Sequence, residues 1–214
     1  METFIRSAVL GVVLGLLSPG AAFAAEEGMG RVTVLGGWRL TPNNHFEASA
    51  VAAGTPLVSR SPGGPALIAG FGYSATALIE VAIDAIVGAE RLHLTGSAPF
   101  TSLTYGALLN LRLQPQFTAD FGMSVGVGTG PVLVDILNSH FKVASERLTE
   151  GWEGEIGLFY RLSPRYSLTL EYRLLLARGT VNGVGSVNAG GSWLGLGFTF
   201  WLSGSDRTQI SDFR

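Results

Sequence analysis

Histidine, serine and carboxylate side chains are the first places to look for chemistry, because an imidazole near neutral pH can activate a hydroxyl nucleophile. The chain has three histidines, His45, His93 and His140, and all fall in or beside segments that lack a strand pattern. Ser139, His140 and Glu146 could be combined into a triad, but no predicted strand supports them, and triad members need rigid elements that hold them in hydrogen-bond contact. We therefore interpret the histidines as exposed loop residues and expect no enzymatic activity.

Metal and cofactor chemistry is also poorly supported. The chain has no cysteine, which excludes thiolate ligands and disulfides, and no Asp, Glu and His residues cluster at ligand spacing. The glycine-rich sequence at 126–130 superficially resembles a nucleotide loop, but it lies on a predicted strand with no helix after it. With 16 acidic and 14 basic residues the formal net charge is −2, which gives no reason to expect nucleic acid as a partner. We expect no cofactor and no metal.

The elements that position the remaining polar residues are strands, because apolar and polar residues alternate almost throughout the chain after residue 25. Between 151 and 162, for example, Trp152, Ile156 and Leu158 share one face, while Glu153 and Glu155 share the other. Eight such segments are predicted, at 30–40, 66–74, 77–90, 103–113, 117–129, 151–162, 166–178 and 192–202. Most reach or exceed the roughly 9–11 residues that a tilted strand needs to cross a bilayer.

The connections alternate in length. Three are tight, at 74–76, 114–116 and 163–165, and four are long, at 41–65, 91–102, 130–150 and 179–191, where a short helix around 135–142 is conceivable. Short turns at one end and long loops at the other are typical of outer-membrane barrels. The mean hydropathy is +0.35 although no mature segment is a long apolar run. We predict an all-β fold, an eight-stranded antiparallel transmembrane β-barrel with short periplasmic turns and long extracellular loops.

The face that carries charge, glycine and serine must be the lumen, since a charged side chain facing lipid would cost about 2–4 kcal/mol at mid-bilayer. Aromatic residues near strand ends suit interfacial girdles: Trp38, Tyr105, Phe117, Trp152, Tyr160 and Tyr166. The predicted lumen set is Glu80, Asp84, Arg112, Asp120, Glu153, Glu155, Arg161, Glu171 and Arg173, with Arg39 nearer the outer end. Two interpretations are open, a plug of paired charges and an ion pathway or gate; buried charges need partners, and the presence of both signs favours the plug.

The turn at 163–165 sets the register of the strands on either side of it. Pairing Arg161 with Ser167 places Glu155 directly opposite Arg173, close enough for a salt bridge between neighbouring strands. A slip of one residue would turn these charges into lipid, so we expect this register to be strongly specified.

The first 24 residues have the layout of a secretory signal peptide. Arg6 precedes an apolar run at 7–17, Pro19 and Gly20 interrupt it short of the roughly 20 residues of a spanning helix, and the small-residue motif at 22–24 follows. We predict cleavage after Ala24, a barrel over 25–202 and a polar tail over 203–214. The expected location is the bacterial outer membrane, with its lipid and lipopolysaccharide as surroundings and a monomer as the assembly.

Two stretches resemble a known group of proteins. The sequence GWEGEIGLFYRLSPRYSL at 151–168 is similar to the sixth and seventh strands of small outer-membrane barrels, and SWLGLGFTF at 192–200 is similar to their last strand. The resemblance is greatest to the outer-membrane protein W family and looser to the outer-membrane protein A barrel domain. It implies an eight-stranded monomer that passes small hydrophobic solutes or maintains the envelope.

The chain departs from that group in two ways. Members commonly end in an aromatic residue, whereas here a polar tail follows Leu202 and Phe213 is penultimate. The W family also offers a largely apolar path, whereas the lumen predicted here is charged. We therefore expect a structural or surface-interaction barrel closed by charged side chains, with a narrow channel for small hydrophobic or ionic solutes as the alternative.

Overall fold

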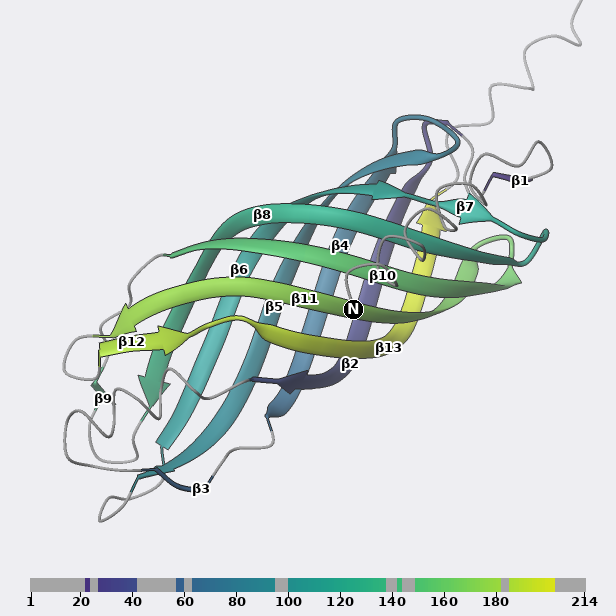
Figure 1. Cartoon of the computed structure of the whole chain (residues 1–214). Helices are drawn as coiled ribbons and strands as arrows, with labels where there is room; N and C mark the ends of the chain where they lie inside the picture. The colour runs from purple at the N-terminus through teal and green to yellow at the C-terminus, as the bar shows by residue number, and fades with distance from the viewer. Residues whose placement is uncertain are drawn as a thin grey trace, which may run out of the picture.

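The computed structural model describes residues 22–23, 27–41, 57–59, 63–94, 100–137, 142–143, 149–181 and 185–202. Within this part, eight long strands form one closed antiparallel barrel (Figure 1). They are β2 (Gly30–Leu40), β4 (Gly64–Ser74), β5 (Ile79–Leu94), β6 (Phe100–Leu113), β8 (Phe121–Leu137), β10 (Thr149–Ser163), β11 (Tyr166–Val181) and β13 (Gly191–Leu202). Each long strand pairs with the next, and β13 closes the barrel by pairing with β2. The predicted fold class is confirmed.

Five short strands extend the barrel at its ends. At one end β1 (Ala22–Phe23) pairs with β7 (Pro115–Gln116), and at the other lie β3 (Leu57–Ser59), β9 (Lys142–Val143) and β12 (Gly185–Asn188) (Figure 1). The helix considered around 135–142 is wrong for the residues described there: β8 continues to Leu137, and β9 pairs with it. Residues 131–137 are instead an apolar run rich in β-branched residues, broken only by Asp135, and this run continues the strand.

The short connections differ in detail from the prediction. The Thr76 hydroxyl accepts hydrogen bonds from the backbone N–H groups of Leu78 (3.2 Å) and Ile79 (3.0 Å), so the next strand begins later than expected. The predicted turn at 114–116 is also longer, because β8 starts at Phe121 rather than at 117. The third turn fits the expectation, with the Ser163 hydroxyl accepting from Tyr166 N–H at 3.2 Å.

The strand register determines the shear of the barrel, which is the residue offset after one full circuit of the strands. Starting at Glu80 and moving each time to the paired residue of the next strand, the path passes Arg112, Gly126, Glu155, Arg173, Trp193, Arg39 and Gly64. Gly64 lies against Glu90, so one circuit returns to β5 ten residues further on (90 − 80 = 10). A shear of this size requires tilted strands. It also places Arg39 and Glu90 nearer the long-loop end than Glu80.

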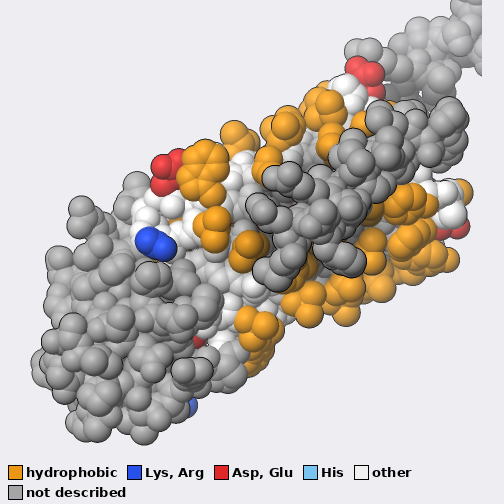
Figure 2. All heavy atoms as spheres, in the orientation of Figure 1, with side chains coloured by type: hydrophobic (Ala, Val, Ile, Leu, Met, Phe, Trp, Pro, Cys, Tyr) orange, Lys and Arg blue, Asp and Glu red, His pale blue; other side chains and the backbone are white. Residues whose placement is uncertain are grey.

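The outer wall is an apolar belt. On the face shown in Figure 2, the visible hydrophobic side chains lie along the middle of the barrel and the visible charged side chains lie toward its two ends. From Trp152 to Leu162 the exposed side chains of β10 are apolar or glycine. Ten residues at about 3.3 Å each, tilted by about 40°, cover about 25 Å, the height of the apolar band of a transmembrane barrel.

The predicted girdle residues lie on this outer wall. Trp38, Phe117, Trp152, Tyr160 and Tyr166 are exposed, as expected for interfacial aromatic residues. Tyr105 is half-buried and its hydroxyl donates a hydrogen bond to Asp135 at 3.2 Å. No helix in the described ranges is long and apolar enough to cross a membrane.

Candidate functional site: the barrel lumen

The inward-facing side chains fill the lumen in three levels, which we name from the short-turn end: the floor, the charged network and the apolar layer. Alternate residues of every long strand supply them, as the strand period dictates. Their burial is nearly complete: Arg173 is 2% exposed, while Leu35 and Leu108 are 0% exposed. The lumen is therefore a packed interior through the described part of the barrel.

Arg112 on β6 is one centre of the charged network. Its guanidinium bonds to Glu155 and Asp84 at short range and donates to Glu80 at 3.1 Å. Glu80 also receives a hydrogen bond from Arg31 on β2 at 2.8 Å. The network thus joins β2, β5, β6 and β10, which are not all neighbours in the sheet.

Arg173 on β11 is the second centre. It contacts Asp84 at 2.6 Å, Glu153 at 3.0 Å and Glu155 at 3.3 Å, and it bonds to Glu171 at short range. Because β5 and β11 lie four strands apart in a ring of eight, the Arg173–Asp84 contact crosses the barrel. The predicted register is confirmed residue by residue, with Glu155 opposite Arg173, and the predicted pair is part of a larger network.

Glycine makes room for these long side chains. Gly126 on β8 lies between Arg112 and Glu155 in the ladder, and the two side chains meet over it. A Cβ at this position would lie 2.8 Å from the Glu155 carboxylate and 2.9 Å from Arg112 Cγ, which is closer than real contacts allow. The glycine-rich sequence at 126–130 is therefore part of the barrel wall, as predicted.

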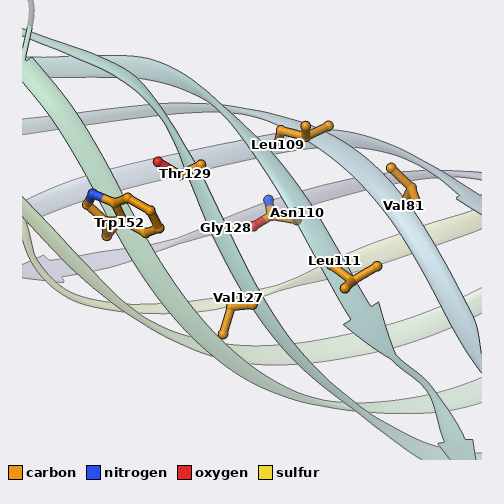
Figure 3. Close-up of a pocket in the computed structure, with 8 residues that line it drawn as sticks. All are labelled: Val81, Leu109, Asn110, Leu111, Val127, Gly128, Thr129 and Trp152. Atoms are coloured by element: carbon orange, nitrogen blue, oxygen red, sulfur yellow. The ribbon is translucent and has the colours of Figure 1, made fainter.

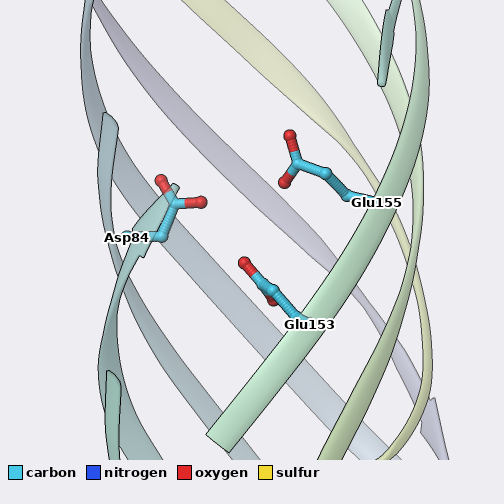
Figure 4. A group of neighbouring side chains, drawn as sticks. All are labelled: Asp84, Glu153 and Glu155. Atoms are coloured by element: carbon cyan, nitrogen blue, oxygen red, sulfur yellow. The ribbon is translucent and has the colours of Figure 1, made fainter. Parts of the chain in front are cut away.

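Three carboxylates of the network come within 4.8 Å of one another, namely Asp84, Glu153 and Glu155 (Figure 4). The space among them is not open to a metal ion, because Arg173 contacts all three and Arg112 contacts two of them. Within the described residues, the ion pairs of the network join three arginines to five acidic residues: Arg31, Arg112 and Arg173 to Glu80, Asp84, Glu153, Glu155 and Glu171. The arginines are therefore the scarcer partners.

The floor is built around Trp201. The guanidinium groups of Arg31 and Arg161 lie 5.7 Å and 5.1 Å from the Trp201 ring, at cation–π distance. Phe159 packs edge-on against the same ring at 6.4 Å, and the indole N–H donates to the Ser167 hydroxyl at 2.7 Å. These contacts close the short-turn end of the lumen with aromatic and cationic groups.

Above the network lies the apolar layer, which the sequence did not lead us to expect. Its buried members are Leu35, Ile68, Ile86, Leu108, Val132, Val134, Leu175, Ala177, Ala189 and Trp193. A largely charged lumen is therefore wrong as a description of its outer half. Strand parity did place these aliphatic residues on the inward face, since Leu108 has the parity of Arg112 and Leu175 that of Arg173, but it did not show that they form a separate layer.

Arg39 covers this layer and lies against Trp193, one of its members. Arg39 donates to the Gly190 carbonyl at 3.0 and 2.8 Å and to the Thr104 hydroxyl at 2.8 Å, and its guanidinium lies 5.5 Å from the Trp193 ring. Trp193 reaches across to β5, where a Cβ on Gly88 would lie 2.9 Å from the ring. Arg39 thus lies at the outer end of the lumen, as predicted.

Seven of the nine predicted lumen charges belong to the charged network: Glu80, Asp84, Arg112, Glu153, Glu155, Glu171 and Arg173. Arg161 is half-buried at the floor, with its guanidinium over the Trp201 ring. The prediction for Asp120 is wrong: it is exposed in the turn before β8, because that strand begins later than predicted.

Sequence reasoning missed Arg31 and Glu90, which are both buried. Both could have been predicted from strand alternation. Arg31 lies an even number of residues from Arg39, and Glu90 lies an even number from Glu80, so each faces the same side as a residue that was predicted to face the lumen. Among the histidines, His93 lies in β5 near its outer end, and His45 and His140 lie outside the described residues, as does the tail over 203–214.

Comparison with known proteins identifies the architecture. No protein-family model matches the chain, and no curated protein matches it. Among solved structures, the outer membrane protein OprG from Pseudomonas aeruginosa is similar with a TM-score of 0.58 at 14% identity, covering 84% of this chain and 98% of that one. Neisserial surface protein A has a TM-score of 0.53 at 15% identity, covering 85% and 98%. The chain has the fold of small eight-stranded outer-membrane barrels.

Proposed function

We propose that this chain is a bacterial outer-membrane barrel whose closed lumen serves a structural or surface-interaction role. It neither catalyses a reaction nor holds a cofactor or metal in this proposal. The protein is exported by a signal peptide over 1–24, so that β1 (Ala22–Phe23) is removed on cleavage. The mature protein functions as a monomer among outer-membrane lipid and lipopolysaccharide. The apolar belt and the fold of OprG and Neisserial surface protein A support this assignment.

The single observation that carries the proposal is the filling of the lumen by consecutive levels of side chains. A barrel of eight strands is just wide enough for its own side chains to fill. The charged network blocks apolar solutes, because they would have to displace paired charges, and the apolar layer blocks ions, because it offers them no polar partner. A solute that one level tolerates is excluded by the other.

A narrow channel is the alternative, and one specific observation favours it. Among the described residues, neither polar atom of the Gln114 side chain has a hydrogen-bond partner, and the same holds for Asn110 Oδ1 and Trp193 Nε1, although all are buried. Buried polar atoms of this kind attract ordered water. A chain of such waters through the barrel would be the path of a small polar solute.

Planar-bilayer recording separates the two. Purified protein that shows the mobility shift of a folded barrel between unheated and boiled samples should give little or no steady conductance. Large, regular channels from the same preparation would overturn the closed lumen and establish the channel. Sequencing of the mature N-terminus should begin at Ala25, which would confirm export, and protein recovered from the periplasm would contradict the proposed location.

A further inference from the structure

The lipid-facing wall of the barrel has a hollow of about 310 Å³. It lies over β6, β8 and β10 with one contribution from β5 (Figure 3). The residues that line it are Val81, Leu109, Asn110, Leu111, Val127, Gly128, Thr129 and Trp152. Its volume is at the lower end of the range for small-molecule pockets, roughly 300–1,000 Å³.

The hollow arises from a local pattern of small and large outward residues. In one row of the ladder Thr129 lies between Leu109 and Trp152, and in the next Val127 lies between Leu111 and Gly154. Gly154 faces open space, with nothing within 4 Å of the place where a Cβ would be. Small residues on β8 and β10 thus form a trough beside bulky side chains, and Val127 within it is 65% exposed.

The polar groups of the trough turn away from lipid. The Thr129 hydroxyl donates to the Gly151 carbonyl at 2.9 Å, and the Asn110 amide donates inward to Asp84 at 2.9 Å. Neither donor therefore needs a partner outside the protein. The surface offered to an occupant is hydrocarbon, since Leu109, Leu111 and Trp152 supply its outward side chains.

The trough starts at the outer edge of the membrane belt and descends. Trp152 lies two residues after the exposed Glu150 on β10, where the outward face changes from charged to apolar. Because the strands are tilted, each paired residue from β5 to β10 lies nearer the long-loop end than the one before it. Val81 on β5 therefore lies deeper in the belt than Trp152 on β10. Figure 3 shows Trp152 and Val81 at opposite ends of the group.

We propose that this trough holds one acyl chain of an outer-leaflet membrane lipid. The trough is continuous with the hydrocarbon-facing belt, opens at the height of the lipid headgroups and runs inward, as an outer-leaflet chain does. Leu109 and Leu111 on one side and Trp152 on the other give a chain more contact than the open wall elsewhere, and dispersion contacts are what distinguishes sites within a bilayer. The site is separate from the lumen and does not depend on whether the lumen conducts.

The two exposed tryptophans make the proposal testable. Trp38 and Trp152 face lipid, whereas Trp193 and Trp201 are buried in the lumen and give the same background in every sample. In detergent micelles, phosphatidylcholine with brominated acyl chains is added to Trp38→Phe, which retains Trp152, and to Trp152→Phe, which retains Trp38. We expect saturable quenching of Trp152 at a lipid concentration at least about tenfold below that for Trp38, which corresponds to about 1.4 kcal/mol.

A matched pair of variants tests the trough itself. In the Trp38→Phe background, Val127→Phe fills the trough, while Val125→Phe adds the same ring on the same face of β8 beside Leu113 and Ile156. Saturable quenching should be lost in the first and kept in the second, with both retaining the heat-dependent mobility of a folded barrel. Equal quenching of Trp38 and Trp152, or quenching that survives Val127→Phe, would show that no chain is held there.

Discussion

Arg173 gives the sharpest test of how the lumen is held together, because it contacts four of the five acidic residues in the charged network. In the Arg173→Met variant the unbranched stem is kept to about the position of Nε, while the rest of the guanidinium and its charge are removed. Glu153 and Glu171 then lose the only cation that an ion pair joins to them in the described residues. Leaving a buried charge without its partner costs about 3–5 kcal/mol, and here two are left. We expect a loss of unfolding free energy at or above that range.

Replacing an acidic residue should cost far less, because five acids share three arginines. Glu153→Gln keeps an oxygen that can accept the 3.0 Å hydrogen bond from Arg173 and removes one charge from three carboxylates lying within 4.8 Å of one another. We expect a change within about 1 kcal/mol, since a neutral hydrogen bond replaces a charged one while repulsion falls. Glu155→Ala should fall between the two, at about 1–3 kcal/mol, because Arg112 and Arg173 keep other partners.

Equilibrium unfolding in urea, with protein folded into phospholipid vesicles and followed by tryptophan emission, measures these differences. All three variants should retain the mobility shift between unheated and boiled samples in mild conditions, so that stabilities of the same fold are compared. The reasoning is refuted if Arg173→Met is as stable as the wild type, or if Glu153→Gln costs as much as Arg173→Met. The second result would mean that each acid is individually required and that the arginines are not limiting.

Three other predictions follow from the packing. Gly126→Ala should lose about 1–3 kcal/mol by crowding the network beneath it, whereas Gly154→Ala, which points into open space, should stay within about 0.5 kcal/mol in the same urea assay. Trp193→Ala should lose about 3–5 kcal/mol from the apolar layer and still give no steady conductance in planar bilayers, since the charged network remains; a new regular channel would show that Trp193 alone closes the lumen. Protease added to intact cells should cut within 41–65 and spare the turn at Pro164, and cleavage at Pro164 would mean that the barrel is inverted.

The sequence was sufficient for the strands and for the local register. Alternation decides which face a residue takes. The turn at 163–165 decides which residue of β11 lies opposite Glu155: Ser163 pairs with Tyr166, and a register shift between Arg161 and Ser163 brings Arg161 opposite Ser167. Both features could be predicted from neighbouring residues. Strand ends were less certain: Phe117 and Phe121 have the same parity, and only the structure shows that the chain turns between them. Asp120 was misplaced for that reason.

Contacts across the lumen could not be predicted in the same way. The pairing of Arg173 with Asp84 depends on the tilt of the strands and on how β13 meets β2, which are properties of the closed ring rather than of any one hairpin. The apolar layer was missed for a related reason. Leu108 and Leu175 have the parity of the charged residues, but nothing local indicates that they meet each other above the network.

Backbone hydrogen bonds between neighbouring strands and ion pairs across the lumen restrain the barrel differently. Backbone hydrogen bonds hold each strand to its neighbours and would survive a slip of two residues, because the same side chains would still face inward. The contacts of Arg173 with Asp84 and of Arg31 with Glu80 join strands that are not neighbours, and such a slip would separate them. Since lipid gives the outer wall little preference for one register, the buried ions discriminate among the possible closures of the ring. We therefore expect the charged network to help select the shear of the barrel, whether or not any solute passes through it.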